Sequence, residues 1–498
     1  AQDDNGQGDF YYAPPSGFLA LCSSNLPDTT ISPNQNEQAT DYMGTALWSG
    51  NATARKISLG FQADWVWTKM RNATNSHYAY DSSRGDDEGL FPDLNQAETT
   101  TSGAVSFGDA DGFDLGTYTQ TNGSGYTFVG WSWRCGGSTP TKTYKVKVVA
   151  DSTDYGHGTG SNKYQFFKSD GTTGFGTNGV DIDLQEGGTY IFDWSDSSAQ
   201  SHPIRFSLTN DGTHSSGTSA GSEYTTGVVK DDSAYKTTIT VASGVATLYY
   251  YCQNHSGMGG QVNTNTTHGS TNFDGSITSV VQSNETAGFS IATYNGTGSL
   301  ATVGHELGAK AQWVIIKKRS ASGNWVIGHH QNGFNGQLYF DTGAFSSNSG
   351  SFNNTAPTST VVTINTDSTI NTSSATYVMY CFTEIEGYSK FGSFVGNGSA
   401  DGTFIYTGFR PAFLIIKNAT SSGYNWIMMD SVRSTFNMVE KSLNPNSSNA
   451  ESSSDVDIDF LSNGFKLRQS SAWMNQSGST FIYMAFGDGN TAKFGNSK

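Results

Sequence analysis

Short apolar runs separated by polar turns extend along almost the whole chain. A run of mainly apolar residues that ends in Lys occurs at residues 63–69, 311–317 and 411–417. Runs of this length, bounded by turns, are typical of buried strands. A polar turn and a second strand-like segment follow each run. Each copy closes with an aromatic strand, at residues 126–133, 377–382 and 481–486. The pattern predicts antiparallel β-structure.

These repeats divide the chain into domains. Three homologous modules occupy residues 41–137, 287–391 and 392–488, and their alternation and turn spacing predict antiparallel β-sandwiches. The second and third modules abut without a linker. An unrelated insert, residues 143–264, separates the first two modules and is bounded by loop-like segments. Residues 1–40 are interpreted as an extended segment that ends an upstream domain. We therefore expect an all-β protein of tandem sandwiches.

Composition agrees with strands and excludes some functions. Of the 498 residues, 59 are Gly and only 14% are charged, whereas helix-rich domains usually carry more Glu, Lys, Leu and Ala. The net charge of −16 disfavours nucleic-acid binding, because phosphate backbones attract Lys and Arg. No apolar run approaches the roughly 20 residues that span a bilayer, so membrane insertion is not expected.

The cysteines do not form a disulfide framework, because they lie far apart in different segments. Cys22, Cys135 and Cys381 follow or lie within apolar strand-like runs, which predicts buried free thiols. Cys252 differs, because it ends an aromatic strand and precedes a short Gly-containing loop.

That loop carries potential metal ligands. Cys252, His255 and Met258 form a Cys-x-x-His-x-x-Met motif, and a tight loop could turn the imidazole and the thioether toward the thiolate. His202, which precedes the strand at residues 204–206, is the natural second imidazole. One thiolate and two imidazoles with a weak axial thioether form the blue-copper arrangement. The sequence therefore predicts a type 1 copper site.

The insert resembles the cupredoxins, such as plastocyanin, pseudoazurin and amicyanin. Cys252, His255 and Met258 match the C-terminal ligand loop of that family, and His202 matches its first histidine. The resemblance implies a Greek-key β-sandwich that binds copper. It fails over residues 210–227, which are unusually rich in Gly, Ser and Thr.

Two alternatives stay open for this domain. Zinc could bind Cys252, His202 and His255 together with a water molecule, since these ligands also suit zinc. The insert could also be a plain β-sandwich that has kept these residues without binding a metal.

Other polar residues give weaker signals. Asp81 and Arg84 recur as Asp430 and Arg433, which predicts an ion pair inside each module. His157 and the pair His329–His330 are expected in surface turns or loops. Glu384 and Glu386 are expected on one strand face near a domain end, with no identifiable opposing acid. No Ser-His-Asp arrangement, phosphate loop or zinc-protease helix is present, so the protein is not expected to be an enzyme.

The repeated modules resemble β-sandwich repeats of tail-fibre and other virion proteins of marine bacteriophages. The segments that carry this resemblance are residues 8–22, 386–392 and 407–413, and the first also resembles the end of SPRY-like domains. The resemblance implies an extracellular, homo-oligomeric appendage of a virion. Its partners would be other virion proteins and a host surface glycan or protein, and its tandem sandwiches would form a rigid rod.

Two other functions fit the same sequence. A secreted electron-transfer cuproprotein would use the sandwiches as spacers. A cell-surface adhesin or carbohydrate-binding protein would use exposed loops of the sandwiches.

Overall fold

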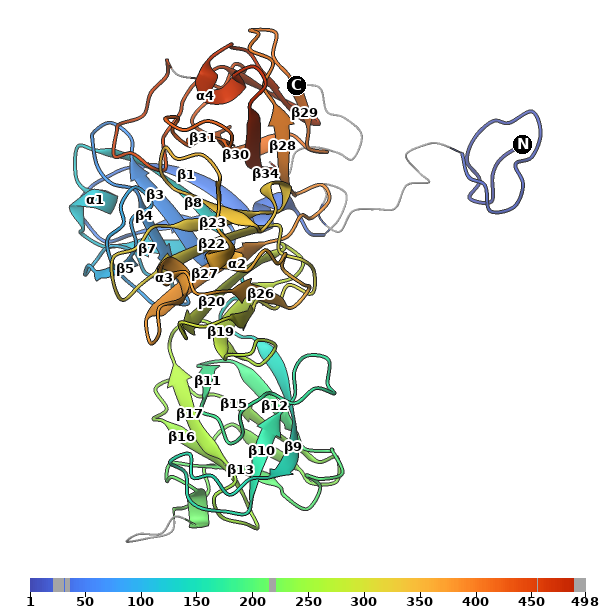
Figure 1. Cartoon of the computed structure of the whole chain (residues 1–498), viewed down its shortest axis with the longest axis vertical. Coiled ribbons are helices and arrows are strands. Elements are labelled where there is room, and N and C mark those ends of the chain that lie inside the picture. Colours follow the sequence, from blue (N-terminus) through green and yellow to red (C-terminus); the bar gives the residue numbers. More distant parts are fainter. Residues whose placement is uncertain (21–30, 32–35, 215–220, 455, 488–498) are drawn as a thin grey trace.

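Strands dominate the computed structural model, which describes residues 1–20, 31, 36–214, 221–454 and 456–487 (Figure 1). The predicted all-β fold is confirmed, because the α-helices in these residues are single turns. None of the helices described is long and apolar enough to cross a membrane.

The three repeats share one architecture. Each has four antiparallel strands in the same order, with the last strand between the first and the second, and in the second module these four form the middle of an eight-stranded sheet. The strand order in the first module is β1 (Met43–Ser49), β8 (Thr127–Trp133), β3 (Trp65–Met70), β4 (Tyr78–Asp81). The second has β20 (Phe289–Asn295), β27 (Thr376–Phe382), β22 (Trp313–Lys318), β23 (Val326–His329). The third has β28 (Ser389–Val395), β34 (Thr480–Gly487), β30 (Pro411–Asn418), β31 (Ile427–Asp430).

A smaller antiparallel sheet and a short helix complete each module. The smaller sheets are β2 (Arg55–Ser58) with β7 (Gly112–Leu115), β21 (Ala301–Gly304) with β26 (Val361–Ile364), and β29 (Phe404–Tyr406) with β33 (Gly464–Leu467) and β32 (Ile458–Leu461). The equivalent helices are α1 (Thr119–Asn122), α3 (Ser368–Asn371) and α4 (Ala472–Asn475). Short additions to the first two modules are β5 (Glu88–Gly89), β6 (Thr99–Thr100), β24 (Gly336–Tyr339), β25 (Ser346–Ser347) and α2 (Ser349–Phe352).

Two boundaries differ from those predicted. Strand β28 begins at Ser389 and pairs with β34, so the third module starts before the expected junction at residues 391 and 392. Strands β18 (Ser270–Asn272) and β19 (Ser279–Asn284) extend the sheet of the second module, so this module begins before the expected residue 287. The first 20 residues contain no strand or helix, and among the described residues the first such element is η2 (Ala39–Asp41).

The large sheets of all three modules face one shared aromatic core. The rings of Trp65 and Tyr380 stack with centroids 4.7 Å apart and join the first two modules. Trp133 of the first module lies 5.5 Å from Phe413 of the third. The third pairing is Trp313 with Trp426, at 6.0 Å. Each module therefore packs against both others.

This closed arrangement contradicts the predicted rod. A rod of tandem sandwiches would bring each module into contact only with its sequence neighbours, whereas here the first module packs on the third. The cause is the pattern of burial, because the central strands β3, β22 and β30 are almost fully buried along their length. Strands that are apolar on both faces must be covered on both faces.

The insert is a separate two-sheet body beneath the repeats (Figure 1). Its first sheet has the order β10 (Asn162–Phe166), β9 (Thr141–Ala150), β12 (Thr189–Asp193), β15 (Lys236–Thr240), β14 (Val228–Asp231). Its second sheet has the order β11 (Ile182–Gln185), β17 (Gly260–Asn265), β16 (Leu248–Cys252), β13 (Ile204–Ser207). Aromatic residues of both sheets share one core, and Phe273 from the junction stacks on Phe166 at 4.5 Å.

Candidate metal centre

The four predicted ligands lie at one end of the insert. Cys252 ends β16 and is paired with Ile204 of β13, so His202 reaches the same sheet edge. The loop from β16 to β17 carries His255 and Met258. Because β17 then runs from this loop toward the repeats, the cluster lies at the end of the insert remote from them (Figure 1).

Three of the four ligands converge. The Nδ1 atoms of His202 and His255 each lie 3.6 Å from the Sγ atom of Cys252. The two imidazole centroids are 4.6 Å apart. One donor atom from each residue therefore lies within 4.8 Å of the others, which is close enough for one ion. Met258 is 1% exposed and belongs to the same hydrophobic core as Cys252.

Burial decreases across the cluster. Cys252 is fully buried, His202 is half-buried and His255 is exposed. The sulfur is therefore shielded from solvent and from other thiols, whereas one imidazole edge lies at the surface.

Hydrogen bonds hold the ligand segments before any metal binds. The Tyr164 hydroxyl donates to the backbone carbonyl of His202 at 2.6 Å. The Asn254 amide donates to the carbonyl of Ser201 at 2.9 Å, which ties the two ligand segments together. The backbone N–H of Asn254 lies 3.4 Å from the Cys252 sulfur and is placed to donate to a thiolate.

The turn between His255 and Met258 is also fixed. The N–H of Gly257 donates to the Asp211 carboxylate at 2.9 Å, and Lys163 donates to the Gly257 carbonyl. Gly257 has a φ of +67°, and an added Cβ would lie 2.7 Å from the backbone of Gly160. Only glycine fits at this position, which explains the Gly in the motif.

The protonation states suit metal binding. Burial raises the pKa of the Cys252 thiol, so a cation is needed to favour its thiolate. Burial, with a smaller contribution from His255, lowers the pKa of His202. This imidazole is therefore neutral at neutral pH, which is the form that binds metals.

The donor set can hold a transition metal. Thiolate and thioether sulfurs are soft ligands that select copper or zinc over calcium or magnesium. Copper would use the two imidazoles and the thiolate, and Met258 lies in the adjoining core. Zinc would use the same three convergent ligands with a water as the fourth.

Other predicted polar residues have structural roles. The Arg84 Nε atom donates to the Asp81 carboxylate at 2.5 Å, and Arg433 does the same to Asp430. The predicted ion pairs are therefore confirmed, and all four side chains are fully buried. Cys135 and Cys381 are buried free thiols as predicted, while Cys22 lies outside the described residues.

The histidines were predicted less well. His329 was expected on a surface loop but lies at the end of β23 with 2% exposure, because its ring packs against Trp313 at 4.8 Å. His157 was expected in a flexible turn, but its ring nitrogens are held by Asn210 and Asp181 at 2.9 and 2.8 Å.

Of the two glutamates, Glu384 pairs with Lys390, whereas Glu386 has no role that the structure explains.

Two carboxylates that join the modules were missed. Glu98 of the first module accepts from Arg84 and from Arg319 of the second. Glu451 of the third accepts from Arg433 and from Arg71 of the first. The only available signal was that Arg71 and Arg319 follow the repeated strand at equivalent positions.

The fold and the cluster define a class: an all-β protein of three interlocked repeats with an inserted β-domain that carries a thiolate–imidazole cluster. The chain belongs to a family described as a domain of unknown function, DUF7483, which it matches over residues 38–158 and 260–489. The interruption covers most of the insert, including all four predicted ligands. Searches among curated proteins and among solved structures gave no match.

Proposed function

We propose that the chain is a non-enzymatic structural protein whose inserted domain binds one copper ion. The observation that carries the copper proposal is the convergence of His202 and His255 on the Cys252 sulfur, each at 3.6 Å. Met258, which is buried in the same core as Cys252, would supply the thioether that completes the set. The resemblance of the insert to the cupredoxins supports the same assignment.

The repeats would serve as a rigid platform for this domain. Their shared core of large aromatic residues joins all three modules, so the copper domain projects from one solid body. Together with the resemblance of the repeats to phage tail-fibre proteins, this supports an appendage on a virion. Its partners would be other virion proteins and a host surface glycan or protein.

A copper titration of the full chain tests the site. Adding Cu(II) should produce an intense visible absorption band, because charge transfers from the thiolate to copper. Cys252→Ser should abolish the band, whereas Cys381→Ser, which removes a buried thiol from the second module, should keep it. If the wild type stays colourless while it binds Zn(II) stoichiometrically, the site is a zinc site.

Electron transfer is a second candidate function. The exposed His255 imidazole favours it, because an electron could enter through a ligand that reaches the surface. Such a function requires reversible reduction of the bound copper, which cyclic voltammetry measures.

The virion location is tested separately, by labelling the chain on purified particles and viewing them by electron microscopy.

A further inference from the structure

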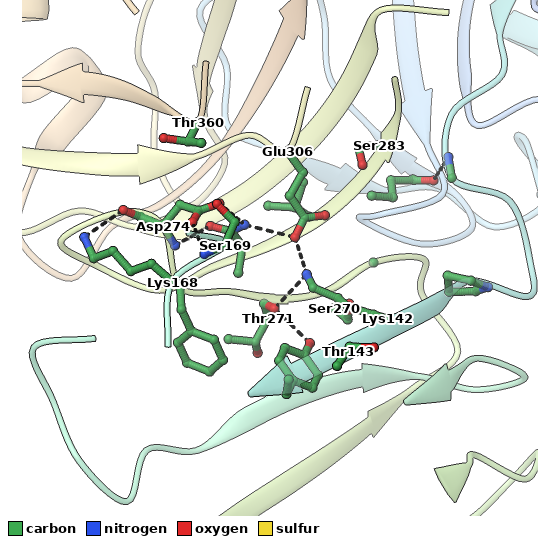
Figure 2. A pocket seen from close by; sticks show the side chains of 18 of the residues that line it. Lys142, Thr143, Lys168, Ser169, Ser270, Thr271, Asp274, Ser283, Glu306 and Thr360 are labelled. Carbon is green, nitrogen blue, oxygen red and sulfur yellow. Dashed lines mark hydrogen bonds and ion pairs between the residues drawn. The ribbon is translucent and has the colours of Figure 1, made fainter. Parts of the chain in front are cut away.

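A polar cleft of about 680 Å³ lies where the insert meets the second module (Figure 2). Strand β9 forms one wall, and β18, the turn after β21 and the segment around Thr360 form the others. Clefts of roughly 300–1,000 Å³ at domain junctions are common sites for small ligands. None of the predicted copper ligands lines the cleft.

Glu306, at the centre of the cleft, has an unusual backbone conformation (Figure 2). It follows β21 with a φ of +52°, which L-residues other than Asn and Asp rarely adopt. The other modules have glycine at the equivalent position after β2 and β29, namely Gly60 at +87° and Gly408 at +89°. The buried residues that follow, Leu307, Phe61 and Phe409, confirm this equivalence. The second module thus carries a glutamate where its relatives carry an unstrained glycine.

Glu306 also pairs with the insert without being closed off from the cleft. Its carboxylate accepts from Lys142 of β9, but the two side chains are 21% and 22% exposed. Both charged groups therefore keep contact with the open cleft, where a ligand can reach them. Strained residues in a cleft are typical of binding and catalytic sites.

The other charges of the cleft are also fixed and balanced. Asn272 donates to the Glu306 carboxylate at 2.9 Å, and Lys142 also donates to the Thr271 carbonyl at 2.9 Å. Lys168 donates to the Asp274 carbonyl, and the Asp274 carboxylate accepts from the N–H of Ser169 at 2.7 Å. These contacts hold the donors and acceptors in place, and neither sign of charge dominates.

Hydroxyl groups line the rest of the cleft. Figure 2 shows the side chains of Thr143, Ser270, Ser283 and Thr360 around Glu306. A lining of hydroxyls, with carboxylates and ammonium groups in equal number, matches a neutral ligand that carries many hydroxyls.

We propose that this cleft binds a neutral saccharide, with the Glu306 carboxylate and the Lys142 ammonium as its central hydrogen-bonding groups. The site does not depend on copper. It supplies a location for the host-glycan binding that forms part of the proposed function.

Titration calorimetry of the metal-free full chain with a panel of neutral mono- and oligosaccharides tests the site. Glu306→Gly introduces the residue found in both other modules and should keep the fold, with a thermal midpoint within about 3 °C of the wild type. It should weaken saccharide binding at least tenfold. Glu306→Gln should also weaken binding, because a neutral amide accepts hydrogen bonds less strongly than a carboxylate.

Asp401→Asn is the control, since it removes an exposed acid of the third module that pairs with Lys466. This variant should bind as the wild type does. The proposal is overturned if no saccharide of the panel binds at millimolar concentration, or if binding survives in Glu306→Gly. Neither result bears on the virion location, which particle labelling measures independently.

Discussion

At the scale of single residues, the buried Asp–Arg pairs show how a repeated sequence feature becomes an interface. Asp81 accepts from Arg84 within the first module and also from the Tyr380 hydroxyl of the second, at 2.6 Å. Asp430 accepts from Arg433 and from the Trp131 indole of the first module, at 3.0 Å. In the second module His329 ends the equivalent strand, and its Nε2 atom has no partner among the described residues. A buried Asp–Arg pair therefore contributes to two of the three interfaces between modules, namely those of the first module with the second and with the third.

Replacing Asp81 by Asn should destabilise the protein strongly. The variant leaves the buried Arg84 guanidinium without its nearest negative charge, and removing one partner of a buried pair costs on the order of 3–5 kcal/mol. Urea unfolding followed by tryptophan fluorescence measures this loss. Lys56→Met, which breaks the exposed pair of Lys56 with Asp109, should leave the midpoint unchanged. Equal effects of the two variants would contradict a special role for the buried pair.

The sequence predicted residues well where chemistry and spacing coincide. The Cys-x-x-His-x-x-Met motif and a histidine before a strand indicated four candidate ligands, and the structure brings His202, Cys252 and His255 together. Glu306 could not be selected, because only the observed backbone shows that it occupies a position that favours glycine. His329 was placed wrongly because adjacent histidines say nothing about the tryptophan that packs on one of them.

At the scale of elements, the short helices α1, α3 and α4 share a structural feature that the composition did not indicate. Each ends in a fully buried asparagine: Asn122, Asn371 and Asn475. Asn371 donates to the carbonyls of Ser299 and Asn365 at 2.6 and 2.7 Å and accepts from the N–H of Thr297 at 2.7 Å. It thereby ties the helix to the turn between β20 and β21. In a chain so rich in Asn, nothing distinguished these three beforehand.

Asn371→Ala should lower the free energy of unfolding by about 1–3 kcal/mol, because it leaves backbone groups without their partners. Asn354, an exposed residue of the same module, provides the control as Asn354→Gly. Its φ of +51° favours glycine, so this control should be neutral or slightly stabilising. Thermal unfolding measures the midpoints of the two variants. A midpoint equal to that of the wild type for Asn371→Ala would show that the hydrogen bonds of Asn371 are dispensable.

At the scale of the whole molecule, local pattern identified the repeats but not their assembly. Periodicity and turn spacing predicted the strands, which the three equivalent sheets confirm. Packing of the first module on the third depends on contacts between residues such as Trp133 and Phe413, which lie far apart in the sequence. The apolar runs of β3, β22 and β30 indicated that these strands are buried, without indicating which partner covers them.

The closed assembly should also respond to acid through Glu98 and Glu451. Burial would raise the pKa of each carboxyl, but the arginines around them prevail and hold both below the ordinary value of 4.5. A carboxyl whose pKa is lower in the folded than in the unfolded state stabilises the fold at pH values above its pKa in the unfolded state. This stabilisation is lost as the pH falls through its pKa in the folded state. The urea midpoint should therefore be constant down to about pH 5 and then fall. The double variant Glu98→Gln with Glu451→Gln loses the ion pairs with Arg319 and Arg71 of the neighbouring modules. Its urea midpoint at neutral pH should therefore be lower than that of the wild type, and it should fall less steeply as the pH is lowered. Parallel curves for the wild type and this variant would show that other carboxylates control the acid response.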